Sequence, residues 1–549
     1  MFRDPHDWLE RVRTLTLQLV GHASVNGTAG EATFSSFLAG LLRQEPYFVR
    51  NPTHLWVEPI AGDPVGRSNV FVLVRGDSER TVLLTGHFDV VSAENYGELA
   101  PWAFDPEALL PRLVKHLERN AQSAPDKRAL DDLRSGRFLP GRGILDMKSG
   151  LAAGLAVLLR YSRSPERAGN LLFIASPDEE NRSAGIRSVV SHLATVMKKW
   201  NLEVAAAINL DATGDDGDGT DGQAIYLGSV GKLLLSVLLI GRDTHAGYPF
   251  DGVNSALFAA GVIQRLECNA GFADLAEGEK APPPTVLKLE DLKQQYDVTT
   301  PGKTWCCINI LTHRMPAREV MESACKLVDE ALTSALAYLR EQAQEWSGHK
   351  RLTQFVPRVL TFHQLRALAL ESGGASATAR LKRLETELKE ENADLPAASK
   401  RLTELLWNAS GLTGPAAVVG FASVPYPSVF LSGDEPGMTV RRVLEREAER
   451  VSAAYCTGIR FRSFFSGISD MSFLGLVDKN DLQFVADNTP TWSLLGFDQE
   501  AIPGLPVVNI GPWGRDYHQS TERVNVAYSF EVLPELVWRV VNGLFLEKR

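Results

Sequence analysis

The stretch Thr81–Asp89, TVLLTGHFD, joins an apolar run of strand length to a histidine and an aspartate. Two similar runs follow further along the chain. Leu171–Ser176 leads into the carboxylates of Pro177–Glu180, and Val204–Leu210 leads directly into Asp211. Runs that are apolar nearly throughout are typical of strands buried on both faces of a mostly parallel sheet.

A helical pattern separates the first two of these runs. Met147–Tyr161 is rich in Ala, Gly and Leu and predicts a helix of small residues. A further apolar run, Leu505–Ile510, is expected to return to the same sheet. The alternation predicts an α/β fold, with a mostly parallel (mixed) sheet flanked by helices.

Side chains that can bind metal follow four of the apolar runs, namely His87, Glu180, Asp211 and, after a glycine-rich turn, His518. A single His-x-Asp at a strand end is more often a hydrogen-bonded pair than a metal site. In open α/β sheets, however, ligands bind outside the carboxyl ends of the strands. Four such residues delivered to one edge therefore predict a metal site.

Local spacing indicates a separate role for each neighbour. Residues i and i+2 of a strand share a face, so Asp89 can accept the proton of the His87 nitrogen that does not bind metal. After a buried strand the adjacent Glu179 and Glu180 diverge, so one can bind metal while the other stays free as a base. Asp146, beginning the helix of small residues, can aim its two oxygens at two cations.

Two nearby patterns could suggest other kinds of site. Gly141–Gly150, GRGILDMKSG, fails as a dinucleotide fingerprint because Asp146 occupies the position of the third glycine. The acidic run Asp211–Asp221 fails as a calcium loop because no register places both the required glycine and the required glutamate. We expect a surface turn after Asp211.

The middle of the chain has a different pattern. Strands are expected at Lys232–Gly241, Thr285–Leu289 and Trp305–His313, and helices at Ser255–Leu266 and Arg318–Trp346. This order predicts a compact α+β unit inserted within the α/β domain.

Two further segments are predicted to be helical insertions. One covers about Glu107–Arg134 and is mainly polar; the other covers about Leu365–Ser410 and is rich in Lys, Glu and Arg. We interpret the second as a solvated insertion rather than a coiled coil, because its apolar seam is short.

Length and composition bound the class of protein. A chain of 549 residues is too long for a single core. A net charge of −10 argues against nucleic acid and anionic membranes as partners, and no apolar stretch reaches the length of a bilayer span. Five cysteines without a CxxC pair are typical of a reducing compartment, so we expect a cytoplasmic protein.

With these residues in hand, the chain resembles the two-zinc amidohydrolase family of aminoacylase, glutamate carboxypeptidase and succinyl-diaminopimelate desuccinylase. The matching segments, in the family's order, are GHFDVV, PWAFDP, SGRFLPGRGILDMKSG, SPDEENRSAG, NLDATG, THAGYPFDGVNSA, THRMP, SGISD and GPWGRDYHQSTERV. The PDEENRSAG form and the YDVTTPGKTWCCIN stretch look most like the branch of arginine-utilisation proteins.

The resemblance implies a role for each matching residue. His87 and Asp211 would complete one metal site, Glu180 and His518 the other, and Asp146 would bridge two divalent ions, with zinc expected and cobalt or manganese as alternatives. Further roles are implied for seven residues: Asp89 orients His87, Glu179 is the general base, His245 reaches the active site of a partner, Arg314 grips a substrate carboxylate, and Gly467, Ser469 and Asp470 form the turn beside the substrate.

The resemblance also implies a domain organisation and an assembly. The catalytic domain would span 1–226 and 413–549, the inserted α+β unit would be a ferredoxin-like lid and dimerisation domain at 227–347, and 348–412 would be a helical insertion. A homodimer through the lid is the family expectation. The asparagine expected before Arg314 is not apparent, which leaves the substrate open.

The leading hypothesis is a metal-dependent hydrolase that cleaves the amide C–N bond of an N-acyl amino acid, a small peptide or a related amide, in arginine-related amino-acid catabolism. One alternative is a dipeptidase or aminopeptidase, which would need a free substrate amine. Another is a non-catalytic binding protein on the same scaffold. The presence of all five ligands and the base argues against the latter, because unused buried carboxylates are costly to keep together.

Overall fold

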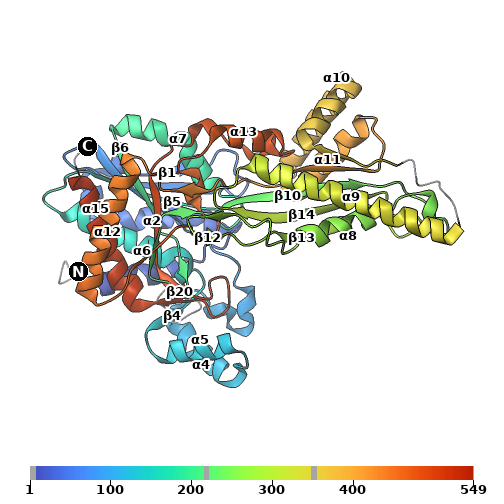
Figure 1. The fold of residues 1–549 in the computed structure, drawn as a ribbon. Coiled ribbons are helices and arrows are strands. Elements are labelled where there is room, and N and C mark those ends of the chain that lie inside the picture. The colour runs from blue at the N-terminus through green and yellow to red at the C-terminus, as the bar shows by residue number, and fades with distance from the viewer. Residues whose placement is uncertain (1–7, 216–221, 348–354, 548–549) are drawn as a thin grey trace. The chain divides into compact units, whose positions relative to one another are not determined.

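The computed structural model describes residues 8–215, 222–347 and 355–547 (Figure 1). The chain divides into two compact units. The first comprises Met1–Ser229, Val429–Leu476 and Ala501–Arg549, and the second comprises Val230–Ser428 and Val477–Glu500. The second unit is thus an insertion in the first, and the chain crosses between them more than once.

The first unit contains an eight-stranded mixed sheet. Its spatial order is β1 (Leu55–Pro59), β2 (Ser68–Val74), β5 (Asn170–Ser176), β3 (Arg80–His87), β6 (Glu203–Asn209), β19 (Val507–Ile510), β8 (Ala224–Tyr226) and β18 (Arg460–Arg462). The central strands β5, β3, β6 and β19 pair in parallel, and β1, β2 and β8 join antiparallel. The predicted mixed α/β sheet is confirmed, and the C-terminal run returns to it as β19.

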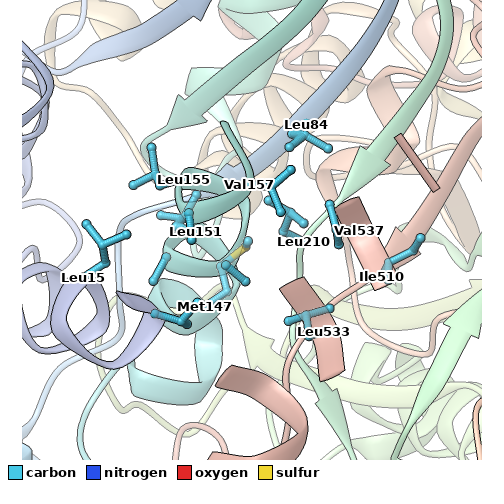
Figure 2. Packing of buried hydrophobic residues seen from close by; sticks show 14 of the residues in the cluster. Leu15, Leu84, Met147, Leu151, Leu155, Val157, Leu210, Ile510, Leu533 and Val537 are labelled. Carbon is cyan, nitrogen blue, oxygen red and sulfur yellow. The ribbon is translucent and has the colours of Figure 1, made fainter. Parts of the chain in front are cut away.

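Helices flank this sheet. They are α1 (Trp8–Gly21), α2 (Ala29–Leu42), α3 (Pro46–Arg50), α6 (Ser149–Arg163), α7 (Ala184–Trp200), α12 (Glu435–Tyr455) and α15 (Leu533–Leu546). Figure 2 shows α6 in the core, with Val157 on the side of Leu84 of β3 and Val537 of α15, and Leu155 on the side of Leu15 of α1. A Cβ on Gly150 would lie 2.0 Å from the carbonyl oxygen of Leu210, so glycine is needed where α6 meets the chain after β6.

A smaller sheet and a helical hairpin complete the first unit. The sheet has the order β4 (Phe138–Pro140), β21 (Arg523–Asn525), β20 (Trp513–Arg515) and β7 (Thr213–Gly214). The first predicted insertion forms α4 (Pro106–Asn120) and α5 (Ala124–Arg134), which begin at the capping side chains of Asp105 and Ser123. The surface turn expected after Asp211 includes residues 216–221, which lie outside the described residues.

The second unit has a five-stranded sheet of its own. Its order is β13 (Thr285–Asp291), β14 (Lys303–Thr312), β10 (Gly231–Ile240), β16 (Ala416–Phe421) and β15 (Arg358–Thr361). One core joins the sheet to α8 (Ser255–Leu266) and α9 (Ala317–Ser347). This is the predicted α+β unit, and its two helices lie where the apolar periodicity predicted them.

The helical insertion covers the other face of this sheet. It forms α10 (Phe362–Glu390) and α11 (Leu395–Ala409), and a second core contains Leu365, Leu402 and Leu406 together with sheet residues. The expectation of a solvated insertion is therefore wrong, because the helices bury a continuous apolar stripe beneath their charged surface. The adjacent cysteines of β14 point to opposite faces of the sheet, so Cys306 lies in the core with α8 and α9 and Cys307 in the core with α10 and α11.

The second unit extends beyond the predicted lid. It includes residues 413–428 and 477–500, which the sequence analysis assigned to the catalytic domain. The reason is local: β16 hydrogen-bonds to β10, and α13 (Lys479–Asp487) contributes Val485 to the core below α9, with α14 (Trp492–Leu495) following. No helix within the described ranges combines the length and apolar character needed to cross a bilayer.

Candidate metal centre

The first group of metal-binding side chains lies at the carboxyl ends of the neighbouring parallel strands β3 and β6. Nε2 of His87, the last residue of β3, lies 3.1 Å from Oδ1 of Asp146 and 3.8 Å from Oδ1 of Asp211. The three side chains are close enough to bind one ion. His87 is nearly completely buried, which gives the group the dry surroundings of a structured site.

A second group shares the same aspartate. Nε2 of His518 lies 3.2 Å from Oδ2 of Asp146 and 3.1 Å from Oε1 of Glu180. Glu180 follows β5, and His518 lies in the turn between β20 and β21 with a positive φ of 65°. The two groups thus use different oxygens of Asp146, as a bridging carboxylate would.

Asp146 is fixed by contacts of its main chain. It lies in the irregular turn Ile144–Lys148, three residues before α6 begins, and so precedes the helix rather than beginning it. The backbone NH groups of Leu145 and Asp146 donate to Oε1 of Glu522, at 3.2 and 3.4 Å. Arg142 binds the other oxygen of Glu522 at 2.6 Å and also donates to the carbonyl of His518 at 3.2 Å. This buried pair joins the turns that carry two of the expected ligands.

Asp89 contacts His87 differently from the expected geometry. Nδ1 of His87 lies 3.1 Å from the carbonyl oxygen of Asp89 and 3.6 Å from its carboxylate. The carboxylate instead accepts the backbone NH groups of Glu179 and Glu180, both at 3.1 Å. Asp89 therefore orients the histidine through its main chain and holds the carboxylate loop through its side chain.

Glu179 lies beside the two groups without belonging to either. Its Oε2 is 3.7 Å from Nε2 of His87, and burial raises its pKa well above the ordinary value. The charge of His87 opposes this shift, whereas the charges of Asp211 and Glu180 reinforce it. A buried carboxyl with a raised pKa can hold a proton near neutrality, which a general base has to do during the reaction.

The electrostatics favour two divalent cations. Two imidazoles lie among four carboxylates, those of Asp146, Glu179, Glu180 and Asp211. Burial lowers the pKa of His518, but its hydrogen bonds to Asp146 and Glu180 have the larger effect and raise this pKa to about 10. Uncompensated buried carboxylates are costly, so the donor set fits cations at this position. Imidazole and carboxylate without thiolate suit zinc, and also cobalt and manganese.

The turn expected beside the substrate lies in the same unit. Oγ of Ser469 accepts a hydrogen bond from Nδ2 of Asn209 at 3.0 Å, and Oδ2 of Asp470 accepts one from Ser176 at 3.0 Å. Burial raises the pKa of Asp470 to about 7. A Cβ on Gly467 would lie 2.8 Å from the ring of Phe465, which explains the small residue there.

His245 and Arg314 belong to the second unit. His245 is exposed, and its Nδ1 accepts the backbone NH of Gly247 at 3.0 Å. Arg314 is held through its main chain by Asp274, whose Oδ2 accepts the NH groups of three successive residues, and its guanidinium pairs with Glu277 at 2.6 Å. Both side chains are open to solvent.

A charged cluster that the sequence did not predict contacts the loop carrying Glu179 and Glu180. Arg67 pairs with Asp63, with Glu31 and with Asp178, which directly precedes Glu179. Asn26 donates to both Asp89 and Asp178, at 3.0 and 3.3 Å. The only signal in the sequence was that Asp178 and Glu522 lie close to expected ligands; nothing indicated Arg67 or Asn26.

Comparison with known proteins identifies the family. The model of the family described as Peptidase family M20/M25/M40 matches residues 121–458. In Bacillus subtilis (strain 168), the uncharacterized protein YqjN is 31% identical over 545 residues, covering 97% of this chain and 96% of that protein, and protein RocB is 32% identical over 556 residues, covering 98% and 96%. Human carnosine dipeptidase 1 shares the fold, with a TM-score of 0.52 at 14% identity over 98% of this chain and 97% of that one.

The family match covers more than half of the chain, and both bacterial relatives align over nearly their whole length. The resemblance inferred from the motifs is confirmed. The chain belongs to peptidase family M20/M25/M40, and is a metallopeptidase or amidohydrolase of that family with a candidate two-ion metal centre.

Proposed function

We propose that this protein hydrolyses the amide C–N bond of an N-acyl amino acid, a small peptide or a related amide, using two divalent ions. The observation that carries the proposal is the position of Asp146, whose two oxygens lie 3.1 and 3.2 Å from the Nε2 atoms of His87 and His518. His87 and Asp211 would hold one ion, and Glu180 and His518 would hold the other. The carboxylate of Asp146 would bind both ions.

Zinc is the expected ion, and cobalt or manganese would fit the same donors. When bound, such ions polarise an amide carbonyl and lower the pKa of a water molecule toward neutrality. The chain's own contribution is to fix the ligands: Asp89 and Glu522 bind the backbone of the loops that carry Glu180 and Asp146. A rigid ligand set keeps the two ions in register with the substrate.

Glu179 acts as the general base in this proposal. It takes a proton from the attacking water and returns that proton to the nitrogen that leaves. In the metal-free protein its burial and the charges of its carboxylate neighbours raise its pKa, whereas the charge of His87 and two bound cations favour the carboxylate form that accepts the proton. Because Glu180 is committed to the second group, the two adjacent glutamates have different tasks.

Arg314, His245 and the turn containing Gly467, Ser469 and Asp470 would recognise the substrate. Arg314 would bind an anionic end of the substrate in place of Glu277, which now pairs with it at 2.6 Å on the exposed surface. Exposed ion pairs are weak, so exchange of Glu277 for a substrate carboxylate costs little. His245 would stabilise the oxyanion that develops at the carbonyl.

The assembly and setting are part of the same proposal. We expect a homodimer through the second unit, in which His245 serves the partner's active site. In support, β13 is an edge strand whose Leu287 and Leu289 are exposed, a surface that a second copy could cover. The similarity to arginine-utilisation proteins makes arginine-related amides the first substrates to try, and the cysteine usage makes the cytoplasm the expected compartment.

The test is amine release from a panel of N-acyl amino acids, arginine-related amides and dipeptides, with zinc- and cobalt-loaded protein. Glu179→Gln should lower turnover roughly 10²–10⁴-fold while two ions per chain remain bound. Glu166→Gln, at an exposed glutamate before the amino-terminal end of β5 and so at the opposite end of that strand from Glu179, is the matched control and should not change turnover. Near-normal turnover of Glu179→Gln with full metal content would overturn the assignment of the base.

A further inference from the structure

We propose that Asp132, on the helical hairpin α4–α5, positions the metal ligand His518 through ion pairs with Arg515 and Arg523. The inference rests on the proposed function, in which His518 binds one of the two ions. It assigns the first helical insertion a task in the metal centre, although the hairpin contributes no ligand.

The two arginines stand at the base of the turn that carries His518. Arg515 is the last residue of β20, and Arg523 is the first residue of β21. Oδ2 of Asp132 accepts hydrogen bonds from Nη1 of Arg515 at 2.7 Å and from Nε and Nη2 of Arg523 at 2.9 and 2.8 Å. One carboxylate oxygen therefore joins both strands just where the turn leaves them.

All three side chains are buried. Arg523 is 0% exposed, Arg515 is 6% exposed and Asp132 is 8% exposed. Two guanidinium groups that converge on one point repel each other unless an anion lies between them, and burial strengthens that repulsion. Asp132 supplies this anion at the point where Arg515 and Arg523 face each other in the antiparallel pairing of β20 and β21.

The turn itself needs support from its surroundings. Asp516 and His518 both have positive φ angles, 58° and 65°, which are unfavourable for residues other than glycine. Arg523 also binds Oδ2 of Asp516 at 2.5 Å and the carbonyl of Thr521 at 3.0 Å. Arg523, which Asp132 binds, therefore contacts the turn both before His518, at Asp516, and after it, at Thr521.

A second set of contacts holds the other end of His518. Its carbonyl accepts hydrogen bonds from Nδ2 of Asn95 at 2.8 Å and from Nη2 of Arg142 at 3.2 Å. These contacts and those of Asp132 hold the main chain of the turn on both sides of His518, which is the position from which its ring faces Glu180 and Asp146. Asp132 is a positioning residue, because it touches no ligand directly.

The hairpin could be fixed to the first unit without any charge. Its apolar residues Leu109, Leu113 and Leu133 are buried in the main core, which is sufficient anchorage. Asp132 is the one charged residue of α4 and α5 that is buried. A buried charge is costly where packing alone would serve, which points to a task for Asp132 at the partners it contacts.

The experiment compares zinc binding by wild type, Asp132→Asn and the matched control Asp131→Asn, an exposed neighbour on the same helix. The two binding constants are measured by competition with a chelator, and metal content by elemental analysis. In Asp132→Asn we expect the affinity of the His518-containing site to fall roughly 10–100-fold, while the site of His87 and Asp211 is unchanged. The control should match wild type.

The ratio of the two affinities separates positioning from a general loss of stability. A purely structural role would lower the melting temperature but leave that ratio as in wild type, and this result would overturn the proposal. Asp132→Glu, which keeps the charge, should restore part of the ratio. If Asp132→Asn does not fold, Arg515→Lys keeps the positive charge, loses the forked geometry and should weaken the same site.

His518→Ala distinguishes a wrong ligand set from a wrong role for Asp132. If it still binds two ions with wild-type affinities, the ligand set of the proposed function is wrong. If it loses one ion while Asp132→Asn binds both normally, the ligand set stands and only the role of Asp132 is refuted.

Discussion

The carboxylate of Asp89 accepts the backbone NH of Glu180 at 3.1 Å, although 91 residues separate the two in the sequence. This contact ties the loop after β3 to the loop after β5. The ligands expected from these loops therefore do not reach the centre independently. A change in one loop should be felt in the other.

Asp89→Asn tests this link. The amide would turn an NH2 group toward a backbone NH of Glu179 or Glu180, both of which now donate to the carboxylate, so two donors would face each other. We expect zinc affinity to fall roughly 10–100-fold, measured by competition with a chelator. Asp77→Asn, at an exposed position, is the control. Unchanged affinity in Asp89→Asn would contradict the link.

Metal binding should release protons. In the metal-free protein, burial lowers the pKa of His518, but its hydrogen bonds to Asp146 and Glu180 outweigh burial and raise the pKa to about 10. Burial also lowers the pKa of His87, but the charge of Glu179 and the hydrogen bond to Asp146 raise it well above the ordinary value. Both rings then carry a proton at neutral pH that an ion has to displace. Apparent zinc affinity should rise between about pH 6 and pH 8 and weaken as the pH falls. Calorimetry in buffers of different ionisation enthalpy should count about two protons from the rings, together with any proton that Glu179 holds in the metal-free protein. A pH-independent affinity would count against both histidines as ligands.

Glu31 should make the stability of the protein depend on pH. Burial and the nearby charge of Asp89 raise its pKa from 4.5 to about 7, against the attraction of Arg67. As the pH rises from about 4.5 to about 7, Glu31 loses its proton in the unfolded chain but keeps it in the folded one. The stability that protonated Glu31 contributes is therefore complete at low pH and is lost as the pH rises through about 7.

Glu31→Gln removes this dependence. The difference in free energy of unfolding, variant minus wild type, should become more positive by about 2–3 kcal/mol as the pH rises from 4.5 to 8. This change is expected whatever the difference is at pH 4.5. Chemical denaturation of metal-free protein at several pH values measures the difference. A difference that is constant over this range would show that Glu31 ionises normally.

Leu402 tests the second core of the inserted unit. It is fully buried on α11, and Leu402→Ala should destabilise the second unit by about 2–5 kcal/mol. Hydrogen exchange should accelerate in β10, β14 and β16, whereas zinc binding by the first unit should stay as in wild type. Arg401→Ala, which removes only an exposed ion pair with Glu391, should cost less than about 1 kcal/mol. Equal effects of the two variants would mean that the helical hairpin does not stabilise the sheet.

The sequence was informative where one local pattern decides the structure. Continuous apolar runs predicted β3, β5 and β6, because a strand that is buried on both faces has apolar residues nearly throughout. The rule that such strands deliver ligands at their carboxyl ends then brought His87, Glu180 and Asp211 together. Asp146 followed less directly, since its turn before α6 is irregular and has no regular period.

Composition misled where it concealed a buried stripe. The helices α10 and α11 are so rich in charge that they resembled a solvated insertion, yet Leu365, Leu402 and Leu406 lie in a core. The cluster around Arg67 was out of reach for another reason. A sequence shows which residues carry charge, but burial and pairing across distant segments decide which charges interact, and Glu31, Arg67 and Asp178 meet only in the folded chain.

The place of β19 in the main sheet has a consequence for how the protein is made. β19 pairs with β6 on one side and β8 on the other, yet the ribosome produces it only after the whole second unit. Until then the nascent chain carries β6 with an open edge, able to pair with any passing strand. Translation that stalls before Val507 leaves that edge without the strand that covers it in the folded protein, so a chain truncated there should aggregate more readily than the complete one.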